Sequence, residues 1–342
     1  NYDLFKWQTK SNIDKYSFSP YLMPINQLEG VQSIYQYADY FPLNNLQDYQ
    51  DWLERLNALP TLINQTTALM KLGIEKGIVP PKITISRIPA QVKQHLVEKP
   101  QDSLFFTKFK SFPKNISESE QQQLTEQATA IIQEKITPAF QTMYEFITQE
   151  YLPACRETVG VWDLPKGKEY YQHLIHHYTT TELTADEIHD IGLKEVARNR
   201  AEMEAVIKEV EFNGDFSEFL NFLRTDPQFY YQTSEELLEG YQAISKRLDP
   251  ELTKLFGKLP RMPYGVIPVP SSMAPDTTTA YYYGPSADGT RPGYYFVNLY
   301  QPETRPKYEM EVLSVHEAVP GHHLQVALQM ELGDLPSFRR YL

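Results

Sequence analysis

Long amphipathic helical segments, repeatedly interrupted by proline, are the feature that most limits the folds open to this sequence. Apolar residues recur at helical spacing over most of the chain, and its 25 prolines divide the pattern into pieces. Two segments open on capping boxes, Thr184 to Glu187 and Thr233 to Glu236, whose side chains satisfy the first backbone N–H groups of a helix. The sequence therefore predicts a mainly α fold, a multi-helix array, with helices over 46–59, 60–76, 168–178, 184–212, 233–256 (divided at Pro250) and 307–332. A further long helix reaches about residue 158, with Ser117 or Ser119 as its cap.

A stretch of different character precedes the last predicted helix. Segments 264–270, 278–283 and 293–300 are rich in Tyr, Val, Ile and Phe, and turn residues Ser286 to Thr290 separate the last two. We expect a small antiparallel β-sheet next to the final helix. By composition the chain divides into three regions of one continuous fold: an N-terminal helical region (1–110), a long-helix region (111–260), and the sheet with the final helix (261–342).

The sequence is acidic, with 44 Asp and Glu against 32 Lys and Arg and a net charge of −12. Nucleic-acid binding depends on clustered basic residues, so no nucleic-acid partner is expected. No apolar run approaches the roughly 18 to 20 residues that span a bilayer, which predicts no transmembrane segment. The single cysteine, Cys155, cannot form an internal disulfide and is interpreted as a buried apolar side chain.

The densest group of reactive side chains lies in the final predicted helix. His316 is followed directly by Glu317, and His322 and His323 follow a Pro-Gly pair. In zinc hydrolases of the HExxH type, two imidazoles one turn apart hold the metal, and the Glu after the first His takes a proton from metal-bound water. The pattern therefore predicts His316 as a metal ligand and Glu317 as a catalytic general base.

Two histidines compete for the role of second ligand. On an unbroken helix His323 lies roughly 20° from His316 around the axis, and His322 lies roughly 120° away. However, Pro320 cannot bond to the carbonyl four residues earlier and Gly321 adds backbone freedom, so a bulge or kink could bring His322 to His316 instead. An ordinary helix end with solvated polar side chains is the opposing interpretation, since bare HExxH-like matches are often false. The concentration of imidazoles beside a Pro-Gly break favours a metal site.

The stretch 316–325, HEAVPGHHLQ, resembles the signature HExxPGH[HY]LQ of a large, mostly bacterial family of unknown function. Its members are often described as lipoproteins and are placed by analogy among the thermolysin-like (gluzincin) zinc metallopeptidases. The likeness covers most of the chain from about residue 40, through segments 151–156, 164–167, 178–181, 183–193 and 291–298. This resemblance implies His322, rather than His323, as the second ligand.

The resemblance also implies a third metal ligand, a Glu on a later helix in a segment similar to EGWALYAE. No such segment is present, and the carboxylate side chains after His323, Glu331 and Asp334, do not have a suitable spacing. The chain therefore resembles an N-terminal fragment of a longer protein. Two imidazoles without a third ligand are expected to hold zinc weakly, and such a fragment is expected to be inactive.

Several other polar residues are lesser candidates. Three imidazoles have ligand-like spacing on one predicted helix but no adjacent carboxylate base, so they are interpreted as packing or surface residues, as are His95 and His189; the three are His173, His176 and His177. In thermolysin-like enzymes an edge strand beside the metal-binding helix binds extended substrate backbone. We therefore predict substrate contacts at the residues directly before that helix, namely Arg291, Tyr294 and Asn298.

These features predict a zinc-dependent hydrolase, specifically a metallopeptidase that uses metal-activated water on a peptide or small amide substrate. Hydrolysis of non-peptide amides uses the same chemistry and remains open. The alternative from another class is a non-catalytic peptide- or envelope-binding lipoprotein on the same scaffold. The chain lacks an initiator Met. Together with the lipoprotein resemblance, this predicts a periplasmic or cell-envelope protein with a lipid anchor on a removed leader.

Overall fold

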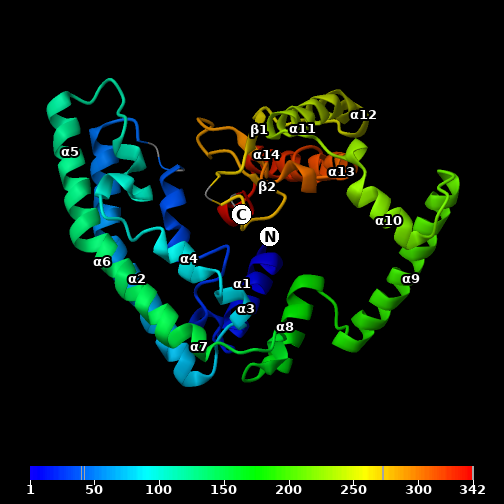
Figure 1. The fold of residues 1–342 in the computed structure, drawn as a ribbon, viewed down its shortest axis with the longest axis horizontal. Helices are drawn as coiled ribbons and strands as arrows, with labels where there is room; N and C mark the ends of the chain where they lie inside the picture. The colour runs from blue at the N-terminus through cyan, green and yellow to red at the C-terminus, as the bar shows by residue number, and fades with distance from the viewer. Residues whose placement is uncertain (40, 42, 272, 341–342) are drawn as a thin grey trace. The chain divides into compact units, whose positions relative to one another are not determined.

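The computed structural model describes residues 1–39, 41, 43–271 and 273–340, and helices dominate it (Figure 1). The predicted mainly α fold class is confirmed. Contacts divide the chain into two compact units, one formed by Lys6–Glu187 and the other by Asn1–Phe5 with Ile188–Leu342. The chain passes between these units after Phe5 and after Glu187, each time within a helix. The sequence regions that divide at 110 and 260 are defined by composition alone.

The unit Lys6–Glu187 is built on two long helical segments that pack along each other. Helix α2 contacts both α5 and α6, which run beside it in Figure 1. Their shared core is made of aliphatic and aromatic side chains, and Cys155 is buried with them as predicted. The helices of this unit are α1 (Tyr2–Tyr16, which begins in the other unit), α2 (Leu46–Lys76), α3 (Lys82–Ile85), α4 (Ile88–Lys93), α5 (Glu118–Ile131), α6 (Thr137–Phe146), α7 (Leu152–Ala154) and α8 (Gly167–Thr179).

Proline affects these helices less than the sequence suggests. The expectation of two helices that meet at Pro60 is wrong, because α2 continues through it. Buried Leu56 and Ile63 lie on either side of this proline, and their packing keeps both halves on one axis although proline removes a backbone hydrogen bond. The later prolines, Pro138 and Pro153, each follow a π-helical turn, a local widening that accommodates a missing hydrogen bond.

His95 lies in the core of this unit and gives a prediction about pH. It is 1% exposed, stacks on Phe140 with ring centroids 4.3 Å apart, and bonds through Nε2 to the Gln32 carbonyl at 2.7 Å. Burial lowers the pKa of His95 from 6.5 to about 4. Between these values the unfolded chain binds a proton that the folded chain does not, so stability falls as the pH falls through this window, by up to about 3 kcal/mol.

Urea unfolding of wild type and His95→Phe at pH 7 and pH 4.5 measures this contribution. The variant should lose less stability on acidification than wild type, because its unfolded state no longer gains this proton. His189→Ala removes an exposed imidazole from the other unit and should leave the pH dependence as it is in wild type. Equal pH dependence in His95→Phe and wild type would contradict the prediction.

The second unit combines helices with a three-stranded sheet. Its helices are α9 (Ala185–Glu209), α10 (Phe216–Thr225), α11 (Ser234–Leu248), α12 (Leu252–Leu255), α13 (Lys307–Glu317), α14 (His322–Glu331) and α15 (Ser337–Arg340), and its strands are β1 (Tyr264–Pro268), β2 (Ala280–Tyr283) and β3 (Gly293–Val297). The predicted capping boxes at Thr184 and Thr233 form at the starts of α9 and α11. Helix α11 packs on both α13 and β1.

The sheet is mixed, so the expectation of an antiparallel sheet is wrong for one of its two pairings. The strand order is β1-β3-β2, in which β2 pairs antiparallel with β3 and β1 pairs parallel with it. The turn at 286–290 joins β2 to β3 as predicted. Strand β3 then inserts between β2 and β1, because its apolar residues, including buried Tyr295 and Val297, suit the central position.

Alternation of side chains gives the sheet two different faces. Ala280, Tyr295 and Val297 pack on α11 and α13 through Leu237, Tyr241 and Met310. The opposite face carries Tyr281, Tyr283, Tyr294 and Phe296, which pack with Val269 and Ala274 of the segment after β1. The face toward α13 is the one that meets the His-Glu sequence.

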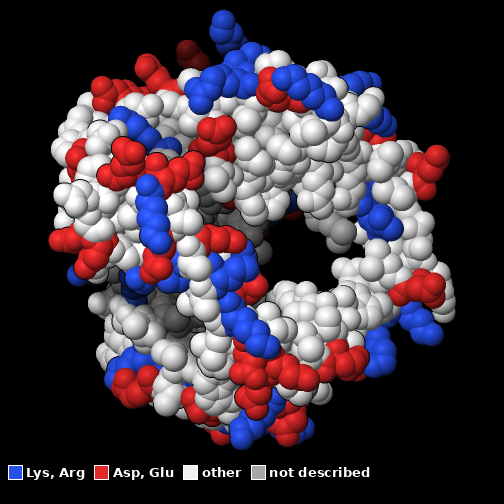
Figure 2. All heavy atoms as spheres, turned by 90° about the vertical axis from the view of Figure 1, so that its right-hand side faces the viewer, with Lys and Arg blue, Asp and Glu red and all other residues white. Residues whose placement is uncertain are grey.

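Charged side chains are interspersed on the face of the molecule shown in Figure 2, and neither sign forms one continuous area there. On α9, Arg198 pairs with Glu195 and Glu202 at 2.8 and 2.6 Å, and Arg200 pairs with Glu204 at 2.7 Å. Such exposed pairs along one helix contribute little to stability. Among the helices that the structure describes, none has the length and apolar character needed to cross a lipid bilayer.

Candidate metal centre

The segment 307–332 contains a break between two helices, at the Pro-Gly pair where the sequence leaves open a bulge or kink. Helix α13 ends at Glu317 and α14 begins at His322, and the Val319–Pro320 peptide bond between them is cis. The His323 N–H donates to the Ala318 carbonyl at 3.0 Å and so ties the second helix to the end of the first. Pro320 has no N–H to continue the helical ladder. Gly321 lies so close to the His316 carbonyl that a Cβ would be 1.8 Å from its oxygen.

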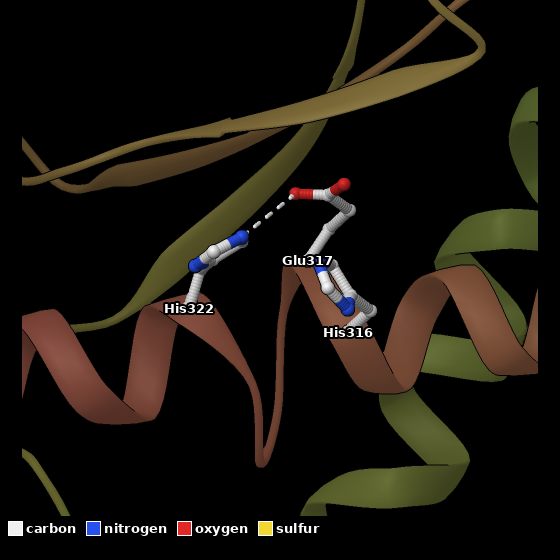
Figure 3. A group of neighbouring side chains, drawn as sticks. All are labelled: His316, Glu317 and His322. Carbon is white, nitrogen blue, oxygen red and sulfur yellow. Dashed lines mark ion pairs between the residues drawn. The ribbon is translucent and has the colours of Figure 1, made fainter. Parts of the chain in front are cut away.

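This break brings His316, Glu317 and His322 together (Figure 3). One donor atom from each residue can be chosen so that all lie within 4.8 Å of one another. The two imidazole rings have centroids 4.8 Å apart and are perpendicular, and His322 Nε2 lies 3.9 Å from Glu317 Oε2. Two imidazole nitrogens and a carboxylate oxygen are ligand types that zinc accepts.

The three side chains differ in exposure in a way that suits chemistry at a surface. The Glu317 side chain is 11% exposed and the His322 side chain is 46% exposed, while His316 is also exposed. Both imidazoles can therefore meet a solute, whereas the carboxylate is largely shielded from water. A shielded carboxylate interacts more strongly with nearby positive charge than a solvated one.

His323, the alternative ligand, has a different environment from His322. It is 2% exposed, its Nδ1 lies 2.9 Å from the Tyr282 hydroxyl, and its Nε2 lies 2.9 Å from the Met262 carbonyl. Desolvation by burial lowers the pKa of His323, which favours the neutral ring. The structure thus groups His322 with His316 and Glu317, and places His323 against the sheet.

The predicted substrate contacts do not join this group. Tyr294 lies with Phe296 on the face of the sheet that points away from α13, and the Arg291 guanidinium lies 4.6 Å above the Tyr283 ring on that same face. Asn298 is 1% exposed, and its amide donates to the Ala274 and Thr278 carbonyls at 2.8 and 3.1 Å. The alternation of strand side chains explains the position of Tyr294, and the loop hydrogen bonds explain that of Asn298.

Tyr282 is the residue near the group that the sequence interpretation missed. Its ring lies 6.3 Å from that of His322 at an interplanar angle of 15°, and its hydroxyl reaches His323. The strand sequence Ala280-Tyr281-Tyr282-Tyr283 places Tyr282 and Ala280 on one face by simple alternation. The sequence contains no signal for which of the two faces meets the metal motif.

The three imidazoles of α8 contact other side chains, and the rings of His173 and His177 stack with centroids 6.3 Å apart. His177 Nδ1 lies 2.8 Å from the Ser11 hydroxyl and its ring stacks on Trp7, while His176 Nδ1 lies 3.3 Å from a Glu182 oxygen. In the part of the chain that the structure describes, the metal-binding geometry is found for the group at the helix break and not for these residues. Their interpretation as packing and surface side chains agrees with these contacts.

A cleft of about 730 Å³ adjoins the break on the side of His323. It is lined by α11, by the segment from Leu259 to Val266, and by Val319 and His323. His316, Glu317 and His322 are not among its lining residues.

Comparison with known proteins places the chain in a family. A sequence model described as "Bacterial protein of unknown function (DUF885)" matches residues 1–342. The chain belongs to the DUF885 family. Among solved structures, this DUF885 chain is similar to the "putative lipoprotein from Colwellia psychrerythraea", with a TM-score of 0.84 and 25% sequence identity. The match covers 93% of this chain and 56% of the Colwellia protein.

The DUF885 chain thus spans about half the length of the solved protein to which it is similar, a share of 56%. No curated protein matches it. The comparisons establish the family and the fold. One structural neighbour is described as a putative lipoprotein.

Proposed function

We propose that this DUF885 protein is a zinc-dependent hydrolase, with a peptide or small amide as its substrate. The observation that carries the proposal is the convergence of His316, Glu317 and His322 across the helix break, with their donor atoms within 4.8 Å. Closeness in sequence does not by itself bring these side chains together. On an unbroken helix, His322 would project roughly 120° away from His316 around the helix axis. A break that aligns two imidazoles beside a carboxylate is expected of a metal-binding hydrolase.

Each residue has a distinct role in this proposal. His316 and His322 would hold the ion through one ring nitrogen each, which the perpendicular rings permit without collision. Zinc, when bound, would lower the pKa of a water ligand toward about 7 and polarise a substrate carbonyl. Glu317 would accept the proton of the attacking water and transfer it to the leaving amine, since a carboxylate oxygen lies within 4.8 Å of a nitrogen of each imidazole.

The coordination sphere needs one more protein ligand. Catalytic zinc sites use three protein ligands and an open position. The group found among the described residues supplies two imidazoles and the general base. Glu331, one of the two later carboxylates, accepts the backbone N–H of Arg261 at 2.8 Å, away from this group. Among the described residues, the group at the helix break offers no third ligand other than Glu317, which this proposal uses as the base.

The structural neighbour supports a location. A lipoprotein is attached to the cell envelope, and the Colwellia psychrerythraea protein carries that description. We propose an envelope location for this protein, with a lipid anchor as its attachment. The same similarity supports a rival function, a non-catalytic envelope protein that binds peptides. Stoichiometric zinc separates the two, because a pure binder has no need of a catalytic metal.

Removal of either imidazole should abolish tight zinc binding. In the intact protein, His316→Ala and His322→Ala should each weaken zinc affinity by more than the roughly 10- to 100-fold that loss of an outer-shell partner costs. Each variant removes one of the two imidazole nitrogens that are proposed to bind the ion. Zinc content by elemental analysis, and affinity by competition with a chelating dye, measure the effect.

His189→Ala serves as the matched control, because it removes an exposed imidazole on α9. It should bind zinc as wild type does. A wild-type protein that holds no zinc, or variants at 316 and 322 that bind as tightly as wild type, would remove the proposed function.

A further inference from the structure

The neighbouring residues His322 and His323 have different surroundings, one exposed and one buried. The His322 side chain is 46% exposed and faces Glu317, whereas His323 is 2% exposed and has both ring nitrogens within hydrogen-bond distance of a partner. A ring with both nitrogens engaged cannot ligate a metal without losing a hydrogen bond. The burial of His323 is therefore better explained by a supporting role than by metal binding.

The direction of the hydrogen bonds at His323 follows from chemistry. The Met262 carbonyl can only accept, so His323 Nε2, at 2.9 Å from it, must carry the hydrogen. In a neutral imidazole the other nitrogen is then an acceptor, so the Tyr282 hydroxyl donates to Nδ1 at 2.9 Å. A chain of fixed polarity runs from the Tyr282 hydroxyl through His323 to the Met262 carbonyl.

All three strands contribute to this arrangement. On β2, Tyr282 provides the hydroxyl, and on β1 the Tyr264 ring lies 4.8 Å from the His323 ring. On β3, Gly293 leaves the space that the pair occupies, because a Cβ there would lie 2.2 Å from the Tyr282 hydroxyl and 2.9 Å from His323 Nδ1. Residues of all three strands thus surround the His323 imidazole.

Anchoring His323 also sets the direction of His322. Successive residues on a helix point about 100° apart, so a first turn that holds His323 against the sheet fixes where His322 projects. The Tyr282 ring lies 6.3 Å from the His322 ring and nearly parallel to it, at 15°. One tyrosine therefore bonds to the anchor and flanks the candidate ligand.

We infer that Tyr282 and His323 are positioning residues that hold His322 in the orientation required to share a cation with His316. This inference rests on the proposed function, because it concerns the same metal group. Outer-shell hydrogen bonds usually reach the ligand ring itself. Here the support passes through the neighbouring residue in the chain and through a tyrosine ring beside the ligand.

Cobalt binding to the intact protein tests the inference, because Co²⁺ substitutes for zinc and its visible absorption reports ligand geometry. Tyr282→Phe keeps the ring and removes one hydroxyl, and His323→Phe removes both hydrogen bonds. Each should weaken Co²⁺ affinity by roughly 10- to 100-fold and change the visible spectrum. The double variant should bind Co²⁺ no more weakly than His323→Phe alone. The Tyr282 hydroxyl acts through its hydrogen bond to His323, and His323→Phe already removes that bond.

Tyr281→Phe is the matched control, because it removes a hydroxyl from the neighbouring position on the opposite face of the sheet. It should leave affinity and spectrum unchanged. Thermal unfolding of the metal-free variants separates positioning from stability. Lower unfolding temperatures with unchanged Co²⁺ affinity and spectrum would overturn the inference and show a purely structural pair.

The test also separates the inference from the proposed function. A wild-type protein that fails to bind Co²⁺ or zinc removes the proposed function before any variant is compared. A wild-type protein that binds, beside a Tyr282→Phe variant that binds equally well, removes only the positioning role. If His323→Phe does not fold, Tyr282→Phe still decides the question, because it deletes a single oxygen atom.

Discussion

Glu317→Gln should remove hydrolysis from the intact protein while zinc remains bound. The substitution keeps the shape of the side chain but removes the base that takes a proton from the attacking water, and such groups contribute roughly 10²- to 10⁴-fold to rates. His316 and His322 retain their nitrogens, so the metal-binding group persists. Turnover of a peptide mixture followed by mass spectrometry, with zinc content measured on the same samples, gives both results.

Glu311→Gln is the control for this variant. It makes the same chemical change on the same helix, at an exposed position. It should leave turnover and zinc content as in wild type. Unchanged turnover in Glu317→Gln would eliminate the general-base role, and loss of zinc in that variant would show that Glu317 acts as a ligand instead.

Gly321→Ala should open the helix break and separate the two candidate ligands. The added methyl group would lie 1.8 Å from the His316 carbonyl oxygen and 2.5 Å from that of Val315, so the backbone must move. Rigid backbone cannot yield as a flexible side chain can, and overpacking of this kind typically costs about 1–3 kcal/mol. Because His316 and His322 lie on the two sides of the break, we expect zinc affinity to fall by at least roughly 10-fold as well.

Gly192→Ala provides the comparison, since a Cβ there meets no atom within 4 Å on exposed α9. Alanine in a helix interior should stabilise by up to about 1 kcal/mol, with no effect on zinc. Urea unfolding and zinc competition on both variants measure the two quantities. A Gly321→Ala variant with wild-type stability and zinc affinity would show that the break can adapt without disturbing the group.

Local patterns were sufficient to predict the class of fold and most helix positions. Apolar periodicity marked the helices, and the capping box at Thr233 marked the start of α11. The helix boundary expected at Pro60 is wrong, because the local preference of proline does not include the packing of the buried residues Leu56 and Ile63 on either side of it. The strands were located by their Tyr-rich composition, but the parallel pairing of β1 with β3 is a long-range contact without a local signature.

Without the family resemblance, which implies His322, the candidate site was predictable only where its residues are consecutive. His316 and Glu317 are adjacent, so their pairing needs no knowledge of the fold. The choice between His322 and His323 depends on the path of the chain through residues 318–321, which helix geometry alone left open. Tyr282 lies near the group through a strand remote in sequence. Nothing in the sequence tells which face of the sheet meets α13, so the position of Tyr294 on the opposite face had no local signal.

The break between α13 and α14 has a consequence for how such proteins can diversify. The two proposed imidazole ligands and the proposed base are encoded in one short peptide, 316–322, whereas Tyr282 and Gly293, which surround the neighbouring His323, belong to strands encoded elsewhere. Substitutions in those strands can therefore retune affinity and reactivity while the short peptide stays intact. Two homologues with identical motifs need not share the same chemistry.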